Sequence, residues 1–129
     1  HEEELYKEYG DVFFLTHFPE STSPFWNMKL GKLDVKKDKK LANKCDVIMG
    51  GMETIGSAER GTDVQEMKEQ FYTISNGEYA KLLFNLFGKD RVELELFKFL
   101  SHDFFPRFGG GIGVTRMISA MKRAGLMEE

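Results

Sequence analysis

The chain has 129 residues and a mass of 14.9 kDa, a length that suits one domain rather than two. Lysine and arginine number 18 against 21 aspartates and glutamates, so the net charge of −3 excludes a chain-wide basic surface for nucleic acid. Cys45 is the only cysteine, which excludes an internal disulfide and favours a reducing, cytoplasmic compartment. No apolar run approaches the ~20 residues that span a bilayer, so we expect no membrane segment.

The first part of the chain predicts a helix followed by strands. Residues 1–9 are charged and helix-prone, as is typical of the end of a surface helix. Residues 11–17 form a short apolar run, which predicts a central strand because both of its faces would be apolar. Residues 18–24 have the composition of a loop, and residues 25–28 predict a short strand.

Residues 29–44 are rich in lysine and are interrupted by Asp34 and Asp38. A run of charge is usually a solvated surface loop, and this is the interpretation that we prefer. The alternative is a contact to a polyanion such as RNA or the phosphates of ATP.

Residues 45–59 predict a β-hairpin. The pair Gly50-Gly51 is a strong turn signal between two strand-like runs. The second run contains Gly56, Ser57 and Ala58 in a row. Strand interiors usually avoid glycine unless a ligand or another backbone comes close, so this strand predicts such an approach.

The next stretch predicts helices. Asp63 and Glu66 have the spacing of a capping box, which predicts a helix that continues to about Phe71. Tyrosine and leucine then recur at helical spacing over residues 79–86, and Gly88 suits the left-handed position after a helix.

Asp90 and Glu93 repeat the capping spacing and predict the start of another helix. An apolar stripe follows, formed by Val92, Leu96, Phe99 and Leu100. After the aromatic cluster of residues 104–108 and a glycine run, residues 116–124 predict a closing amphipathic helix, with Gly125 at its C-terminal end.

Three charged residues on the predicted hairpin form the first candidate site. Asp46 and Glu53 stand on the two strands that flank the turn, and two carboxylates that face one pocket suit Mg²⁺, with phosphates and waters completing its coordination. Arg60 at the end of the second strand has the planar guanidinium that binds a carboxylate or a phosphate. The alternative is that all three are ordinary surface charges.

The glycine run of residues 109–113, followed by Arg116, forms the second candidate site. Glycines permit positive φ and close backbone approach to a flat or charged ligand, and an arginine can stack on an aromatic base. No Gly-Lys-Ser/Thr follows, so the run is not a P-loop, and Val114 excludes a dinucleotide fingerprint. The alternative is a tight turn between a strand and a helix.

Together the two segments resemble the C-terminal half of the catalytic core of class II aminoacyl-tRNA synthetases, in the aspartate/asparagine/lysine subgroup. Asparaginyl-tRNA synthetase and the related ammonia-dependent asparagine synthetase are the most similar. The likeness lies in residues 14–19, 46–53, 55–60 and 105–113, together with Arg116. The resemblance implies an α+β fold, in which an antiparallel sheet is flanked by helices.

The resemblance also implies a function for each matching residue. Asp46 and Glu53 would bind Mg²⁺ and the phosphates of ATP, and Arg60 would read the side chain of an aspartate or asparagine substrate. Glu53 and Arg60 would be the catalytic residues. The reaction would be attack of the amino-acid carboxylate on the α-phosphate of ATP, which gives an aminoacyl-adenylate and pyrophosphate. Such chemistry depends on positioning and charge neutralisation.

The remaining ATP contacts would come from the second segment. Arg116 would stack on adenine, and Gly111 and Gly113 would line the adenine and ribose site. The family usually has an acidic residue before this arginine, whereas this chain has Thr115. A hydroxyl residue at this position is typical of the asparagine-synthetase branch.

The resemblance is incomplete, because the family's first motif, its second motif and its anticodon-binding domain are not in this stretch. Residues 1–129 are therefore expected to be the C-terminal half of a catalytic domain, with a helical insertion at about residues 63–100. The insertion is expected to be a packing element or, alternatively, a specificity or partner-binding appendage. The start at His1 suggests a longer parent protein, expected to be a homodimer that contacts tRNA through regions outside this stretch.

Three functions remain open at this stage. The first is an amino-acid-activating ligase of the asparaginyl- or aspartyl-tRNA synthetase type, or its ammonia-dependent relative. The second is a non-catalytic synthetase paralog that binds a nucleotide, an amino acid or a protein. The third is a structural domain whose motifs are coincidental.

Overall fold

The computed structural model describes residues 2–34 and 39–128. Its elements in chain order are α1 (Glu2–Tyr9), β1 (Val12–Pro19), the 3₁₀ turn η1 (Glu20–Thr22), β2 (Leu30–Asp34), β3 (Lys39–Met49), β4 (Met52–Glu59), α2 (Val64–Thr73), the 3₁₀ turn η2 (Ile74–Gly77), α3 (Glu78–Phe87), α4 (Lys89–Leu100), β5 (Phe108–Ile112) and α5 (Val114–Arg123). None of the described helices is long and apolar enough to cross a membrane.

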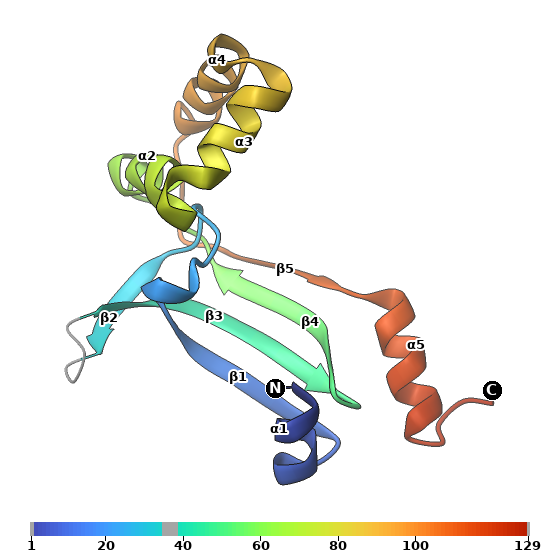
Figure 1. The fold of residues 1–129 in the computed structure, drawn as a ribbon. Helices are drawn as coiled ribbons and strands as arrows, with labels where there is room; N and C mark the ends of the chain where they lie inside the picture. Colours follow the sequence, from blue (N-terminus) through green and yellow to red (C-terminus); the bar gives the residue numbers. More distant parts are fainter. Residues whose placement is uncertain (1, 35–38, 129) are drawn as a thin grey trace.

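The five strands form one antiparallel sheet in the order β1-β3-β4-β5, and β2 also pairs with β3. Figure 1 shows α2, α3 and α4 stacked at one end of β5 and α5 at its other end. Helix α1 lies near the tip of the β3–β4 hairpin. The predicted α+β class, with an antiparallel sheet flanked by helices, is therefore confirmed.

Two predictions about the first strands are wrong. β1 was expected to be central, but among the described residues it pairs only with β3, and Val12 and Phe14 on one of its faces are 55% and 65% exposed. An apolar composition indicates how many faces of a strand are covered. It does not indicate whether the strand pairs with a neighbouring strand on one side or on both. Residues 25–28 do not form a strand, since only Met28 makes an isolated bridge, to Arg60.

The lysine-rich stretch is also different from the expected loop. It forms β2 and the first half of β3, whereas residues 35–38 lie outside the described residues. Leu30 and Ala42 are paired and buried, and Lys40 on the same strand forms a surface ion pair with Glu66. The many lysines predicted a loop, but a strand with one face exposed needs only a few small or apolar residues on its buried face.

The helix signals are largely confirmed. The Asp63 carboxylate accepts a hydrogen bond from the Glu66 amide at 2.9 Å and so caps α2. Gly88, with a φ of +84°, ends α3 and directly begins α4, so Asp90 lies inside the first turn of α4 and does not cap it. The predicted glycine after the last helix is confirmed, since Gly125 has a φ of +73°.

Helices α2, α3 and α4, which we call the helical unit, have a core of their own. Phe71 of α2 is buried in it, together with Ala80, Val92 and Leu96. Trp26, from the loop that precedes β2, packs edge-on against Phe71 with the ring centroids 5.5 Å apart. The indole therefore joins the helical unit to the strands.

The backbones of β4 and β5 come unusually close together. A Cβ atom on Gly110 would lie 2.6 Å from the Gly56 carbonyl oxygen and 2.9 Å from the Ser57 Cβ. A Cβ on Gly111, the next residue, would meet nothing within 4 Å. The small residues of β4 therefore do receive another backbone, as the sequence predicted.

This difference predicts opposite outcomes for two neighbouring substitutions. Gly110→Ala forces β5 away from β4 and is expected to lower the free energy of unfolding by about 1–3 kcal/mol. Gly111→Ala is expected to change it by less than about 0.5 kcal/mol, because the added methyl enters open space. Urea denaturation of both variants measures the difference, and equal losses would contradict the close approach of β5 to β4 at Gly110.

Glu59 at the end of β4 connects three parts of the sheet. Its carboxylate accepts hydrogen bonds from the Lys29 ammonium at 2.9 Å and from the Asn43 side-chain amide at 2.6 Å. These two bonds, the one from Lys29 above all, lower the pKa of Glu59 below the ordinary value of 4.5. The contact therefore stabilises the fold while the carboxylate is ionised.

The sign of this pKa change predicts a pH dependence. A carboxylate with a lowered pKa contributes stability that is complete above pH 4.5 and is lost as the pH falls through its folded-state pKa. We expect wild type to melt at a higher temperature than Glu59→Gln at neutral pH, and the gap to close on acidification. Glu128→Gln, at an exposed position, serves as the control and should follow wild type. A gap that widens in acid would contradict this assignment.

Candidate active site

The register of the sheet brings the predicted site residues onto one face. Asp46 on β3 pairs with Gly56 on β4, and Gly56 pairs with Gly111 on β5. Residues that pair directly across antiparallel strands point to the same side of the sheet. A carboxylate and two glycines from three strands therefore form one row.

Glu53 reaches this face through an irregularity in β4. Val47 pairs with Ile55 but Ile48 pairs with Glu53, so Thr54 is an extra residue and forms a β-bulge. In a regular strand, residues 53 and 56 would point to opposite faces, because side chains alternate with a period of two. The bulge puts Glu53 opposite Ile48 and on the same face as Asp46.

The two carboxylates consequently meet above Gly56. A Cβ atom on Gly56 would lie 2.8 Å from Glu53 Oε1 and 3.5 Å from Asp46 Oδ1. Any residue with a side chain at this position would occupy the space between the two oxygens. A side chain at position 56 would therefore require the Glu53 carboxylate to move.

Asp46 is nearly inaccessible, with 4% of the residue exposed. Its Oδ2 accepts from the Lys44 ammonium at 2.5 Å, whereas Oδ1 has no hydrogen-bond partner among the described residues. A buried carboxylate oxygen without a partner is costly, and its position facing Glu53 suits a hard cation. No group of three or more histidine, cysteine or acidic residues that could hold a metal ion occurs in the described part of the chain, so phosphates and waters would have to complete the coordination of Mg²⁺.

The start of α5 holds the bulged part of β4. The Arg116 guanidinium donates to the Glu53 carbonyl oxygen at 2.9 Å, and the Gly113 amide donates to the Thr54 carbonyl oxygen at 2.8 Å. A Cβ on Gly113 would lie 3.4 Å from the Arg116 side chain. The glycine thus leaves room for the arginine, which stands beside the carboxylate pair.

The end of α5 holds the turn of the same hairpin. The Arg123 guanidinium donates to the Gly50 carbonyl oxygen at 2.6 Å and forms an ion pair with Glu3 of α1 at 3.3 Å. The turn residues Gly50 and Gly51 have φ angles of +57° and +82°, as the predicted two-glycine turn requires. Two arginines of one helix therefore bond to the hairpin that carries Glu53.

Arg60 lies on the same face, directly after the end of β4. It follows Gly56 by four residues, which corresponds to roughly 13 Å in an extended strand. Its guanidinium lies over β5, since a Cβ on Gly109 would be 2.8 Å from the Arg60 Nε. The structure thus groups Asp46, Glu53 and Arg116 closely and leaves Arg60 separate from them.

Lys44 is the residue of this face that the sequence did not single out. It was included in the lysine-rich stretch, where one more lysine carries little information. The informative signal was its spacing, because residues 44 and 46 of a strand point to the same face. The position of the strand had to be known before that spacing could be used.

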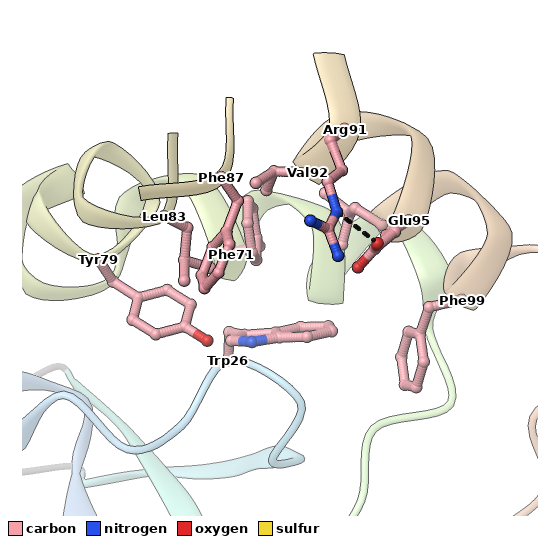
Figure 2. A pocket seen from close by; sticks show the side chains of 10 residues that line it. Trp26, Phe71, Tyr79, Leu83, Phe87, Arg91, Val92, Glu95 and Phe99 are labelled. Carbon is pink, nitrogen blue, oxygen red and sulfur yellow. Dashed lines mark hydrogen bonds and ion pairs between the residues drawn. The ribbon is translucent and has the colours of Figure 1, made fainter. Parts of the chain in front are cut away.

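A cavity of about 330 Å³ lies in the helical unit. Figure 2 shows Trp26, Phe71 and Phe99 around it, with the Arg91–Glu95 ion pair at its edge. The Arg91 Nε and Glu95 Oε1 are 3.1 Å apart, so these two charges satisfy each other. The cavity is mainly aromatic and aliphatic and lacks a converging pair of carboxylates, which leaves the sheet face as the candidate active site.

Solved structures with the same fold include several synthetases. The chain is similar to Entamoeba histolytica asparaginyl-tRNA synthetase in complex with asparaginyl-adenylate, with a TM-score of 0.65 and 20% identity over 93% of this chain and 24% of that one. For asparaginyl-tRNA synthetase from Pyrococcus horikoshii the TM-score is 0.62, with 21% identity over 95% of this chain and 26% of that one. For aspartyl tRNA synthetase from Entamoeba histolytica it is 0.56, with 21% identity over 91% and 21%.

The chain therefore spans between 21% and 26% of the length of these structures. A search of curated protein sequences finds no significant match. The sequence model of the family described as tRNA synthetases class II (D, K and N) matches residues 2–126. Because this match extends over almost the whole chain, the chain belongs to the class II tRNA synthetases of the D, K and N group.

Proposed function

We propose that the protein containing this chain is an ATP-dependent, amino-acid-activating ligase of the asparaginyl- or aspartyl-tRNA synthetase type. Its reaction would be attack of the amino-acid carboxylate oxygen on the α-phosphorus of ATP, with release of pyrophosphate and formation of an aminoacyl-adenylate. The observation that carries this proposal is the convergence of the Asp46 and Glu53 carboxylates above Gly56, beside Arg116. The asparaginyl-adenylate in a similar structure is consistent with it.

Asp46 and Glu53 would hold Mg²⁺ through Oδ1 and Oε1, the two oxygens that lie over Gly56. A Mg²⁺ ion held there supplies positive charge to the phosphates of ATP. Glu53 is suited to this position because Arg116 donates to its carbonyl oxygen and Gly113 donates to the carbonyl oxygen of the next residue, Thr54. The residues would thus contribute by positioning the phosphates, without proton transfer.

Arg116 would stack on the adenine base. One nitrogen of its guanidinium is bonded to the Glu53 carbonyl, which holds the group beside the end of β4, and the residue is exposed. A planar guanidinium can stack on an aromatic ring. Gly111 would line the base and ribose site, since the space where its side chain would stand is open. Gly113 would act through Arg116, whose side chain it accommodates.

Arg60 would bind the side chain of the amino-acid substrate, aspartate or asparagine. Its distance along β4 from the carboxylates leaves room for a substrate that extends from the phosphates to the guanidinium. A planar guanidinium can bind the carboxylate of aspartate or the amide oxygen of asparagine. This geometry is compatible with both amino acids.

The acceptor and the assembly are part of the same proposal. We expect tRNA to be bound through regions outside this stretch, in a cytoplasmic homodimer, as the family resemblance implies. Thr115, which precedes Arg116 in place of the usual acidic residue, favours ammonia as an alternative acceptor, as in the asparagine-synthetase branch. A non-catalytic paralog that binds nucleotide or protein is the remaining alternative.

ATP–pyrophosphate exchange by the full-length protein tests the activity. With Mg²⁺ present, we expect exchange that depends on aspartate or asparagine and is absent with the other standard amino acids. Product analysis with tRNA or ammonia then identifies the acceptor. Failure to exchange with any amino acid would reject the ligase and favour the non-catalytic paralog.

Substitutions in the site test the assigned residues. Glu53→Gln and Arg116→Ala are each expected to lower kcat/KM for ATP in the exchange assay by about 10²–10³-fold, because each removes a charge that positions the phosphates or the base. Glu66→Gln, which removes a carboxylate from a surface ion pair with Lys40, is the matched control and should retain activity. Equal effects of Glu53→Gln and Glu66→Gln would refute the site.

A further inference from the structure

Lys44 occupies a defined position beside the carboxylate pair. Its ammonium lies 2.5 Å from Asp46 Oδ2, and its side chain is 21% exposed. The same ammonium stands 4.1 Å from the centroid of the Phe18 ring. A carboxylate and an aromatic face therefore hold the charge together, unlike the charge of a mobile surface lysine.

The pairing has an electrostatic reason. Asp46 is buried, and a buried carboxylate needs a nearby positive charge to offset its lost hydration. Lys44 is its only ion-pair partner within the described residues. It occupies Oδ2 alone, so Oδ1 remains directed at the space above Gly56 that Glu53 also faces.

We propose that Lys44 is a built-in counter-ion that competes with a divalent cation for Asp46 and so weakens metal binding in the absence of nucleotide. This inference rests on the proposed function, which assigns Asp46 and Glu53 to a magnesium ion. An ammonium on one oxygen and a divalent ion on the other oxygen of one carboxylate repel each other at a separation of a few ångströms.

The consequence is an order of binding. The free protein already has Asp46 neutralised by Lys44, so a divalent cation gains less from this carboxylate than from an unpaired one. The negative phosphates of ATP offset the added repulsion when they enter the site together with the ion. Lys44 thus favours the metal–nucleotide complex over the metal alone.

The sign of the effect separates this role from a simpler one. If Lys44 only held Asp46 in a suitable orientation, its removal would weaken metal binding. If Lys44 competes with the metal, its removal strengthens metal binding.

Mn²⁺ titration of the full-length protein without nucleotide, followed by electron paramagnetic resonance, makes this measurement independently of activity. Mn²⁺ is the probe because it binds to the same oxygen ligands as Mg²⁺. Lys44→Met is expected to bind Mn²⁺ about tenfold more tightly than wild type. Adding Asp46→Asn to this variant should remove the gain, because it removes the contested charge.

Lys40→Met is the matched control. Lys40 also lies on β3, and its substitution removes the same charge as Lys44→Met. Its ammonium pairs with Glu66 at 3.3 Å, whereas the ion-pair partner of Asp46 within the described residues is Lys44. Its Mn²⁺ affinity should stay within about twofold of wild type, since the long-range effect of one exposed charge is screened. Should Lys44→Met fail to fold, as judged by circular dichroism, Lys44→Gln carries the same test, because it also removes the charge.

Unchanged or weaker Mn²⁺ binding by the folded Lys44 variant would overturn the counter-ion role, even in a protein that catalyses exchange. A gain of the same size in Lys40→Met would also overturn it, since net charge would then explain the result. Absence of Mn²⁺ binding in wild type and in the Lys44 variant, with and without ATP, would instead reject the metal site of the proposed function. The two failures are therefore distinguishable.

Discussion

In β4, Thr54 is an extra residue between Glu53 and Ile55, and the geometry of the site depends on this bulge. It turns the Glu53 side chain onto the face that carries Asp46. The carbonyl oxygens of the bulge, those of Glu53 and Thr54, accept hydrogen bonds from Arg116 and Gly113 at the start of α5. This single bulge thus positions the Glu53 side chain and joins the β3–β4 hairpin to α5, the helix that follows β5.

The second constraint is the close approach of β4 and β5. Gly110 permits it, since a side chain there would collide with the Gly56 carbonyl group. Gly111 and Gly56 then keep the site face open in the same row. Glycine therefore serves two purposes in this sheet. Gly110 permits the close approach of the strands, whereas Gly111, whose side-chain position is on the opposite face, leaves the site face open.

The opposite face of the sheet carries an apolar row. Phe14, Val47, Ile55 and Ile112 pair in one row across four strands, and the two end residues are more than half exposed. On the site face, Lys44 and Asp46 form an ion pair. The net charge of −3 therefore says little about this site, because the local pairing of charges determines its electrostatics.

The sequence by itself determined the β-hairpin, the cap at Asp63, the helix ends at Gly88 and Gly125, and the family, because these depend on neighbouring residues or on motif spacing. It did not determine the edge position of β1 or the strands in the lysine-rich stretch, since pairing partners are distant in the chain. Only the tertiary structure decided that Glu53 shares a face with Asp46 and that Lys44 is bound to Asp46. A shift of one residue in register reverses the direction of every following side chain, and register is set by contacts between strands.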